Sequence, residues 1–207
     1  MSRELADSLR WSDDGTDLFL GLTDGLSESK FDSASALPNW TRRHLVAHVA
    51  ANADALCNLV HWAATGEVTP MYSSAEERAA SIEQGATLSG PELNRWAHAA
   101  ASKLGGMMGG LSESQWSAEV TTAQGRVVRA TEIPWMRARE VYVHSVDLRL
   151  GAEFAELPEA FLHALSEDVI RKRGEVPDVE ADLPQRVAWL TGRPSGLDDA
   201  PDLGPWL

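Results

Sequence analysis

The feature that most constrains the fold is a helical repeat of apolar side chains between Thr41 and Gly66. Its apolar positions fall on one face of a helix: Leu45, Val49, Leu56, Leu59 and Val60. Thr41 is a favourable residue for capping the first turn, and Gly66 is a favourable residue for ending the last one. Because a long helix with one apolar face needs other helices to cover it, the sequence predicts a mainly α fold.

Further helices are predicted on both sides of this one. Apolar residues recur at uneven helical spacing over residues 3–27, and Ser74 with Glu77 and Ser89 with Glu92 each have the spacing of a capping box. Three more helices are predicted over 131–150, 158–173 and 184–191, and a small hairpin over 118–130. We therefore expect a helical bundle for residues 1–150. Residues 151–207 would form a short C-terminal appendage, either helical or α+β.

Two details of these helices concern glycine and proline. The helix after Ser89 runs into the glycine-rich segment 105–110, which lacks the Gly-Lys-Ser/Thr ending of a phosphate-binding loop. We interpret this segment as a frayed helix end or a bend. Thr131 is expected to cap the next helix, with Pro134 in the first turn, where a missing N–H is tolerated.

Composition excludes several classes of function. The 207 residues include 18 Lys and Arg against 31 Asp and Glu, a formal charge of −13, which argues against binding to nucleic acid or to an anionic membrane. A small anionic substrate would need an arginine close by. Cys57 is the only cysteine, so no disulfide forms within the chain. With an acidic N-terminal segment and no run of about 18 apolar residues, the sequence predicts a cytoplasmic protein.

One pair of residues suggests chemistry. Glu140 and His144 are four residues apart on a predicted helix, so their side chains lie one turn apart on the same face. A third metal ligand would have to come from another helix, and His48 is the leading candidate, followed by His44 one turn earlier. Two imidazoles and one carboxylate suit catalytic zinc, and also iron(II). The alternative is a solvated pair of side chains, since no HExxH motif accompanies them.

Other polar residues near these positions have simpler interpretations. Asp147 and Asn52, one turn along from His144 and His48, are candidates for orienting those imidazoles, although surface positions are favoured for both. Cys57 lies among apolar residues and is interpreted as a small buried hydrophobe rather than a nucleophile.

The order of residues across 40–150 carries more information than their spacing alone. The matching segments are Trp40–Asn52, Ala55–Ala63, Thr65–Glu67, Thr69–Tyr72, Thr122–Arg126, Trp135–Arg137 and Arg139–Val141, followed by His144 and Val146–Leu148. In these segments, which stay in register, the chain resembles the mycothiol-dependent maleylpyruvate isomerases.

This resemblance implies a DinB-like four-helix bundle followed by a smaller α+β domain. It also implies a zinc site made by His48, Glu140 and His144, and a functional arginine at Arg193, within Thr191-Gly192-Arg193. The family usually has a longer segment with strands before its final helix, whereas residues 174–183 fill that space here as an acidic linker.

The implied activity is cis–trans isomerisation of maleylpyruvate to fumarylpyruvate, with zinc and mycothiol as cofactors. A zinc-bound thiolate of mycothiol would add to the substrate double bond and leave after rotation, while Arg193 would pair with the anionic substrate. Two alternatives remain open. One is a mycothiol S-transferase that uses the same thiolate, and the other is a non-catalytic binding protein in which the metal only stabilises the bundle.

Overall fold

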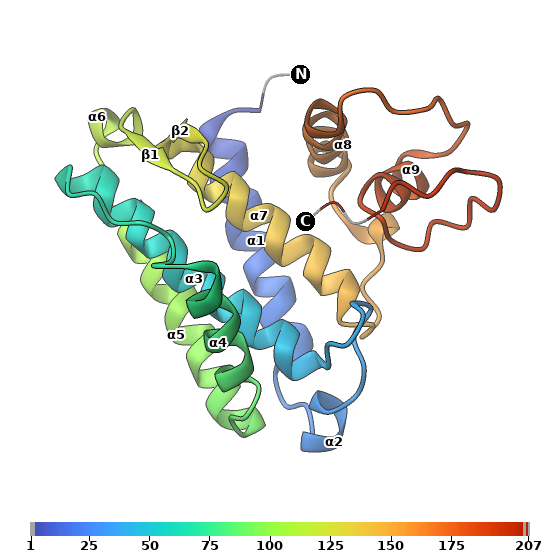
Figure 1. Ribbon diagram of the computed structural model, residues 1–207, viewed down its shortest axis with the longest axis horizontal. Helices are drawn as coiled ribbons and strands as arrows, with labels where there is room; N and C mark the ends of the chain where they lie inside the picture. Colours follow the sequence, from blue (N-terminus) through green and yellow to red (C-terminus); the bar gives the residue numbers. More distant parts are fainter. Residues whose placement is uncertain (1–2, 205, 207) are drawn as a thin grey trace. The chain divides into compact units, whose positions relative to one another are not determined.

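The computed structural model describes residues 3–204 and 206 and is mostly helical (Figure 1). The chain divides into two compact units, one formed by Glu4–Leu150 and the other mainly by Gly151–Leu207. The mainly α fold class predicted from the helical spacing is confirmed. Among the helices of the described residues, none has the length and apolar character needed to cross a membrane.

The first unit is built around four long helices. Its elements, in chain order, are α1 (Leu5–Thr23), α2 (Glu28–Phe31), α3 (Arg42–Thr65), α4 (Ala75–Gly85), α5 (Gly90–Gly109), α6 (Glu113–Trp116), β1 (Glu119–Thr121), β2 (Val127–Arg129), the 3-10 turn η1 (Ala130–Glu132) and α7 (Ile133–Asp147). Helix α1 packs along α7, and α3 packs along both α5 and α7 (Figure 1). Helix α4 lies on α3. This arrangement places α3 and α7 side by side.

Helix α3 has the bounds that its sequence predicts. It starts after Thr41 as N-cap and ends at Gly66, whose φ of 79° is the left-handed conformation that favours glycine at a helix C-terminus. Leu45, Leu56 and Leu59 are fully buried. Because residues of α3 contribute to both apolar clusters of the bundle, this helix is its central element.

Two helix ends differ from the sequence prediction. Helix α5 continues through the glycine-rich segment to Gly109, so the predicted fraying or bend is wrong. Leu104 and Met108 are both buried there, and their packing outweighs the low helix propensity of the neighbouring glycines. Thr131 does not cap α7, because it lies within η1 and the helix begins at Ile133, with Pro134 in its first turn as expected. Ile133 is fully buried, which holds this start against the core.

The predicted hairpin is confirmed. Strands β1 and β2 pair antiparallel, with Val120 opposite Val128, and Gly125 adopts a positive φ of 76° in the connecting turn.

The second unit contains a 3-10 turn and two helices. These are η2 (Phe154–Glu156), α8 (Glu159–Arg173) and α9 (Leu183–Leu190), and α8 packs on α9. Arg173 links α8 to later residues, donating from Nε to the carbonyl of Leu190 at 2.9 Å and from Nη1 to that of Leu203 at 2.6 Å. No strand occurs among the described residues after Gly151, so the helical alternative predicted for this region is the one observed.

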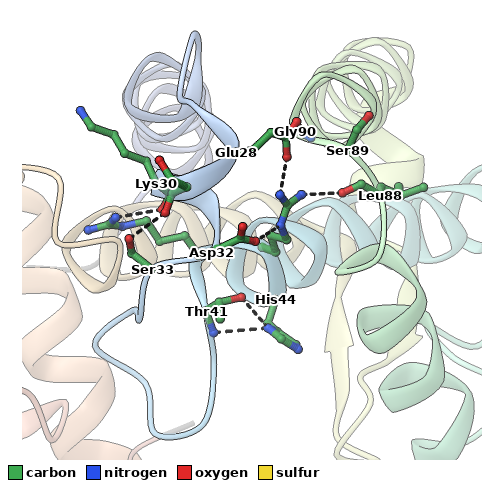
Figure 2. A network of polar contacts seen from close by, with 12 residues as sticks. Glu28, Lys30, Asp32, Ser33, Thr41, His44, Leu88, Ser89 and Gly90 are labelled. Atoms are coloured by element: carbon green, nitrogen blue, oxygen red, sulfur yellow. Dashed lines mark hydrogen bonds and ion pairs between the residues drawn. The ribbon is translucent and has the colours of Figure 1, made fainter.

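Two adjacent arginines at the start of α3, Arg42 and Arg43, connect this helix to neighbouring segments. Figure 2 shows Glu28, Asp32 and Leu88 in the polar network at this helix start. Arg42 donates from Nε to the carbonyl of Leu148 at 2.6 Å. Arg43 donates to Asp32 Oδ1 and to the carbonyl of Leu88, both at 2.6 Å, and also contacts the carboxylate of Glu28. These contacts tie the short helix α2 and the segment before α5 to α3.

Replacing Arg43 by glutamine is expected to lower the free energy of unfolding by about 1–3 kcal/mol, because the Leu88 carbonyl and two carboxylates lose a donor together. Arg10→Gln is the matched control, since Arg10 is exposed and its contacts are a salt bridge to Asp7 within one helix turn and the ring of the adjacent Trp11. Urea titration of both variants tests this. Equal midpoints for the two would contradict the assigned role of Arg43.

Candidate metal centre

The three residues predicted as metal ligands converge between α3 and α7. Nε2 of His48 lies 3.0 Å from Oε2 of Glu140, and Nε2 of His144 lies 3.2 Å from the same oxygen. One donor atom from each residue can be chosen so that all three lie within 4.8 Å of one another. The i, i+4 spacing places Glu140 and His144 on one face of α7, and the packing of α3 on α7 brings His48 to them.

The trio is largely shielded from solvent. His48 and His144 are 5% and 8% exposed, and 17% of the Glu140 side chain is accessible. The two imidazole rings meet edge to face with centroids 5.0 Å apart. The ring of Trp40 lies 5.5 Å from that of His48 and covers one side of it. The side chains are therefore held in place by packing as well as by hydrogen bonds.

Asp147 orients His144. Its Oδ2 lies 2.9 Å from Nδ1 of His144, so Nδ1 donates to this carboxylate and the ring is turned with Nε2 towards Glu140. The surface position favoured for Asp147 is wrong, because the residue is fully buried. The backbone N–H of Ala36 donates to the carbonyl of Asp147 at 2.8 Å, which ties this end of α7 to the segment before α3.

Asn52 does not orient His48. It is buried, contrary to the favoured surface position, and its Oδ1 accepts a hydrogen bond from Nη1 of Arg137 at 3.2 Å. The same Nη1 donates to the carbonyl of Val49 at 2.7 Å. Asn52 therefore accepts a hydrogen bond from the buried guanidinium of Arg137, and among the described residues it makes no contact that would orient His48.

Arg78 of α4 is the site residue that sequence reasoning missed. Its Nη2 lies 3.4 Å from Nδ1 of His48, and its guanidinium lies 5.9 Å from the ring centroid of Tyr72. No spacing rule connects residue 78 with residue 48, because the contact exists only once α4 has folded back on α3. Tyr72 lies within one of the segments that carry the family resemblance.

Electrostatics favour a charged carboxylate at the centre of the trio. Burial acts to raise the pKa of Glu140, but hydrogen bonds from His144 and His48 hold it well below its usual range. Burial lowers the pKa of His48. Burial opposes protonation of His144 too, yet hydrogen bonds to Asp147 and Glu140 raise its pKa. Glu140 is therefore an anion between two imidazoles.

These residues fit a divalent metal ion. Zinc bonds of about 2.0–2.1 Å in tetrahedral geometry place neighbouring donors about 3.3 Å apart, close to the two donor separations observed here. Two imidazole nitrogens and one carboxylate oxygen form a donor set used by catalytic zinc sites. The Asp147–His144 contact supplies the outer carboxylate that metal-binding histidines commonly have.

The remaining candidates lie apart from this group or act differently. His44, the second choice for a ligand, is not part of the trio; its Nδ1 accepts from the backbone N–H of Thr41 at 3.3 Å and so caps α3. Cys57 is buried, and burial raises the pKa of its thiol to about 11, so its interpretation as a small hydrophobe is confirmed. Arg193, in the second unit, donates to the carbonyl of Thr191 at 2.6 Å, and its functional role stays a prediction.

The described residues also line a cavity of about 420 Å³ between α1 and α5. Its lining includes Asp13, Asp17, His98 and the buried Arg137, and contains none of the trio. The candidate metal centre and this cavity are therefore separate features of the bundle.

Comparison with known proteins decides the family. Residues 12–149 match the family described as the mycothiol maleylpyruvate isomerase N-terminal domain. The chain belongs to the mycothiol maleylpyruvate isomerase family. The resemblance inferred from the sequence is thus confirmed, and the matched range contains His48, Glu140 and His144.

Two solved structures extend the family match to nearly the whole chain. The crystal structure of a histidine-to-alanine variant of the mycothiol-dependent maleylpyruvate isomerase is 35% identical, with a TM-score of 0.92. A second crystal structure of the mycothiol-dependent maleylpyruvate isomerase is 34% identical, with a TM-score of 0.91. Each match covers 99% of this chain and 98% of the other. No curated protein matches the chain.

Proposed function

We propose that this member of the mycothiol maleylpyruvate isomerase family is a mycothiol-dependent cis–trans isomerase that converts maleylpyruvate into fumarylpyruvate. His48, Glu140 and His144 would hold a divalent metal, zinc in the first instance. The observation that carries this proposal is the convergence of these three side chains from α3 and α7. The identity of 35% with a solved isomerase over nearly the full chain supports the choice of reaction.

When bound, zinc supplies a Lewis acid that keeps a thiol ionised at neutral pH. The protein's part is to hold the ligands in the required state. Asp147 accepts a hydrogen bond from Nδ1 of His144, which leaves Nε2 of that ring for the metal. Glu140 stays charged because its pKa lies well below the usual range. Since Glu140 is engaged by both imidazoles, it is not free to act as a general base, and proton transfer falls to solvent.

The nucleophilic sulfur has to come from outside the chain. Cys57 is the only cysteine, and its thiol is buried with a pKa of about 11, so it supplies almost no thiolate at neutral pH. In the proposed reaction mycothiol supplies a sulfur that adds reversibly to the substrate double bond and is recovered. Arg193 is proposed to pair with a carboxylate of the substrate or with the developing enolate.

Replacing Cys57 by alanine is expected to leave the mycothiol-dependent rate within about twofold of the parent, because this thiol takes no part in the chemistry. The same variant should lose some stability, since a buried side chain becomes smaller. Initial rates measured at saturating mycothiol test this prediction. A variant that folds but no longer isomerises would assign the nucleophile to Cys57.

One assay separates the proposed reaction from its alternatives. Metal-loaded protein is incubated with maleylpyruvate, with and without mycothiol. The cis-to-trans change is followed by absorbance, and the concentration of free mycothiol is measured before and after the reaction. Product formation with mycothiol unconsumed supports the isomerase. Stoichiometric loss of mycothiol would instead identify an S-transferase. A metal-saturated protein that alters neither compound would identify a binding protein.

A further inference from the structure

Arg78 reaches the candidate metal centre from a third helix. It belongs to α4, which packs on α3, and it is partly buried. Its Nη2 is 3.4 Å from Nδ1 of His48, and its guanidinium lies over the ring of Tyr72 at 5.9 Å. A cation is therefore held beside the imidazole that α3 contributes to the trio.

The contact with Arg78 matters because it involves Nδ1 of His48, the ring nitrogen that does not face Glu140. Its Nε2 faces Glu140 and is the nitrogen positioned to ligate a metal, which requires the lone pair on that atom. A neutral imidazole with a free lone pair on Nε2 carries its proton on Nδ1. Arginine offers only donors. At 3.4 Å, Nη2 of Arg78 can donate to an unprotonated Nδ1 of His48, but in the metal-binding tautomer Nδ1 is itself a donor. That hydrogen bond is then lost, and both groups need an acceptor.

The two histidines of the trio differ in this respect. His144 donates from Nδ1 to the buried carboxylate of Asp147. Metal-binding histidines usually have such an acceptor for the second nitrogen. Among the described residues, no carboxylate takes that role for His48, and none forms an ion pair with Arg78. The neighbouring Glu140 is engaged by both imidazoles, and Glu77, one residue before Arg78, accepts from Ser73.

We propose that Arg78 and the Nδ1–H of His48 together bind a carboxylate group of the substrate next to the metal centre. Two donors 3.4 Å apart can both reach one carboxylate at charge-assisted hydrogen-bond distances of about 2.7–2.9 Å. The proposal rests on the proposed function, because it takes the metal-binding tautomer of His48 as the working state. It makes Arg78 a substrate-binding residue of the helical bundle.

The negative charge of the whole protein is a reason why an anionic substrate needs Arg78. A chain of formal charge −13 repels an anionic substrate, and the trio itself contains the charged Glu140. A guanidinium at the edge of the trio offsets that repulsion locally, and its planar donors fit a carboxylate. The ring of Tyr72 packs against the guanidinium and limits its freedom, so less entropy is lost when the carboxylate binds.

Calorimetric titration with maleate, a cis dicarboxylate, tests the proposal on zinc-loaded protein. We expect Arg78→Gln to weaken maleate binding by about tenfold to a hundredfold, the loss typical of a hydrogen bond to a charged group. Arg78→Lys keeps the charge without the planar fork and should fall in between. Arg95→Gln is the matched control, because Arg95 is an exposed arginine of α5 and changes the net charge equally. It should bind maleate as the parent does.

Metal content and steady-state kinetics of the same variants complete the test. Arg78→Gln should retain one zinc per chain, and its KM for maleylpyruvate should rise by a factor similar to its loss of maleate affinity. Unchanged maleate affinity and KM in an otherwise active enzyme would overturn the role of Arg78 and leave the proposed function intact. Loss of zinc in both Arg78 variants would also overturn it, since Arg78 would then support His48 itself. Maleate binding that depends on Arg78 in a protein without isomerase activity would refute the proposed function alone.

Discussion

His48→Ala is expected to yield a folded protein that no longer retains zinc and no longer isomerises maleylpyruvate. His48 is the only ligand that α3 contributes to the trio, and without it Glu140 and His144 leave two donors on a single helix. Removing a residue that only hydrogen-bonds to a metal ligand typically weakens metal binding by about 10–100-fold. Removing the ligand His48 itself should weaken zinc binding by more than that. Zinc per chain after dialysis and the mycothiol-dependent rate are the two measurements.

His44→Ala is the matched control for this prediction. His44 lies one turn earlier on the same helix, and its ring accepts from the N–H of Thr41 without belonging to the trio. Its loss should lower stability by about 1 kcal/mol, as the loss of a helix cap does, while zinc content stays at one per chain. Full zinc content and full activity in His48→Ala would refute the assignment of the metal centre.

Asp147→Ala is expected to lower zinc affinity by about 10–100-fold without removing any of the three ligands. The fully buried carboxylate of Asp147 holds the proton on Nδ1 of His144, and without it the ring is free to adopt the other tautomer. Competition with a chromophoric chelator measures the change in affinity. Asp147→Asn preserves the size of the side chain, retains one oxygen acceptor, and should lose less affinity than Asp147→Ala.

Asp168→Ala controls for the removal of a buried carboxylate as such. Asp168 lies on α8 in the second unit, where it is within 3.6 Å of Arg171 and 3.5 Å of Lys172. Its replacement should affect stability but not zinc affinity. Equal zinc affinities for Asp147→Ala and the parent protein would show that His144 does not depend on Asp147 for its orientation.

Local sequence rules predicted most of the helices because the signals that start and stop them are local. Ser74 accepts from the N–H of Glu77 at the start of α4, and Thr41 and Gly66 bound α3 as expected. The end of α5 escaped prediction because glycine propensity alone favours fraying at residues 105–110. The burial of Leu104 and Met108 outweighs that propensity, and it depends on helices distant in the sequence.

The candidate metal centre also combines features set by neighbouring residues with features set by helices distant in the sequence. The spacing of Glu140 and His144 is local, so their shared face could be predicted from the sequence. Choosing His48 over His44 needed the orientation of α3 towards its neighbours, which its apolar face indicated. The burial of Asp147 is a property of the folded bundle, and the approach of Arg78 depends on the packing of α4 on α3. Neither has a sequence signature.

The most direct test of the account is a crystal of the zinc-loaded protein measured at the zinc absorption edge. We predict one anomalous peak per chain, about 2.0–2.2 Å from Nε2 of His48, from Nε2 of His144 and from a carboxylate oxygen of Glu140. No peak between these three side chains, or a full peak held by other residues, would contradict the account.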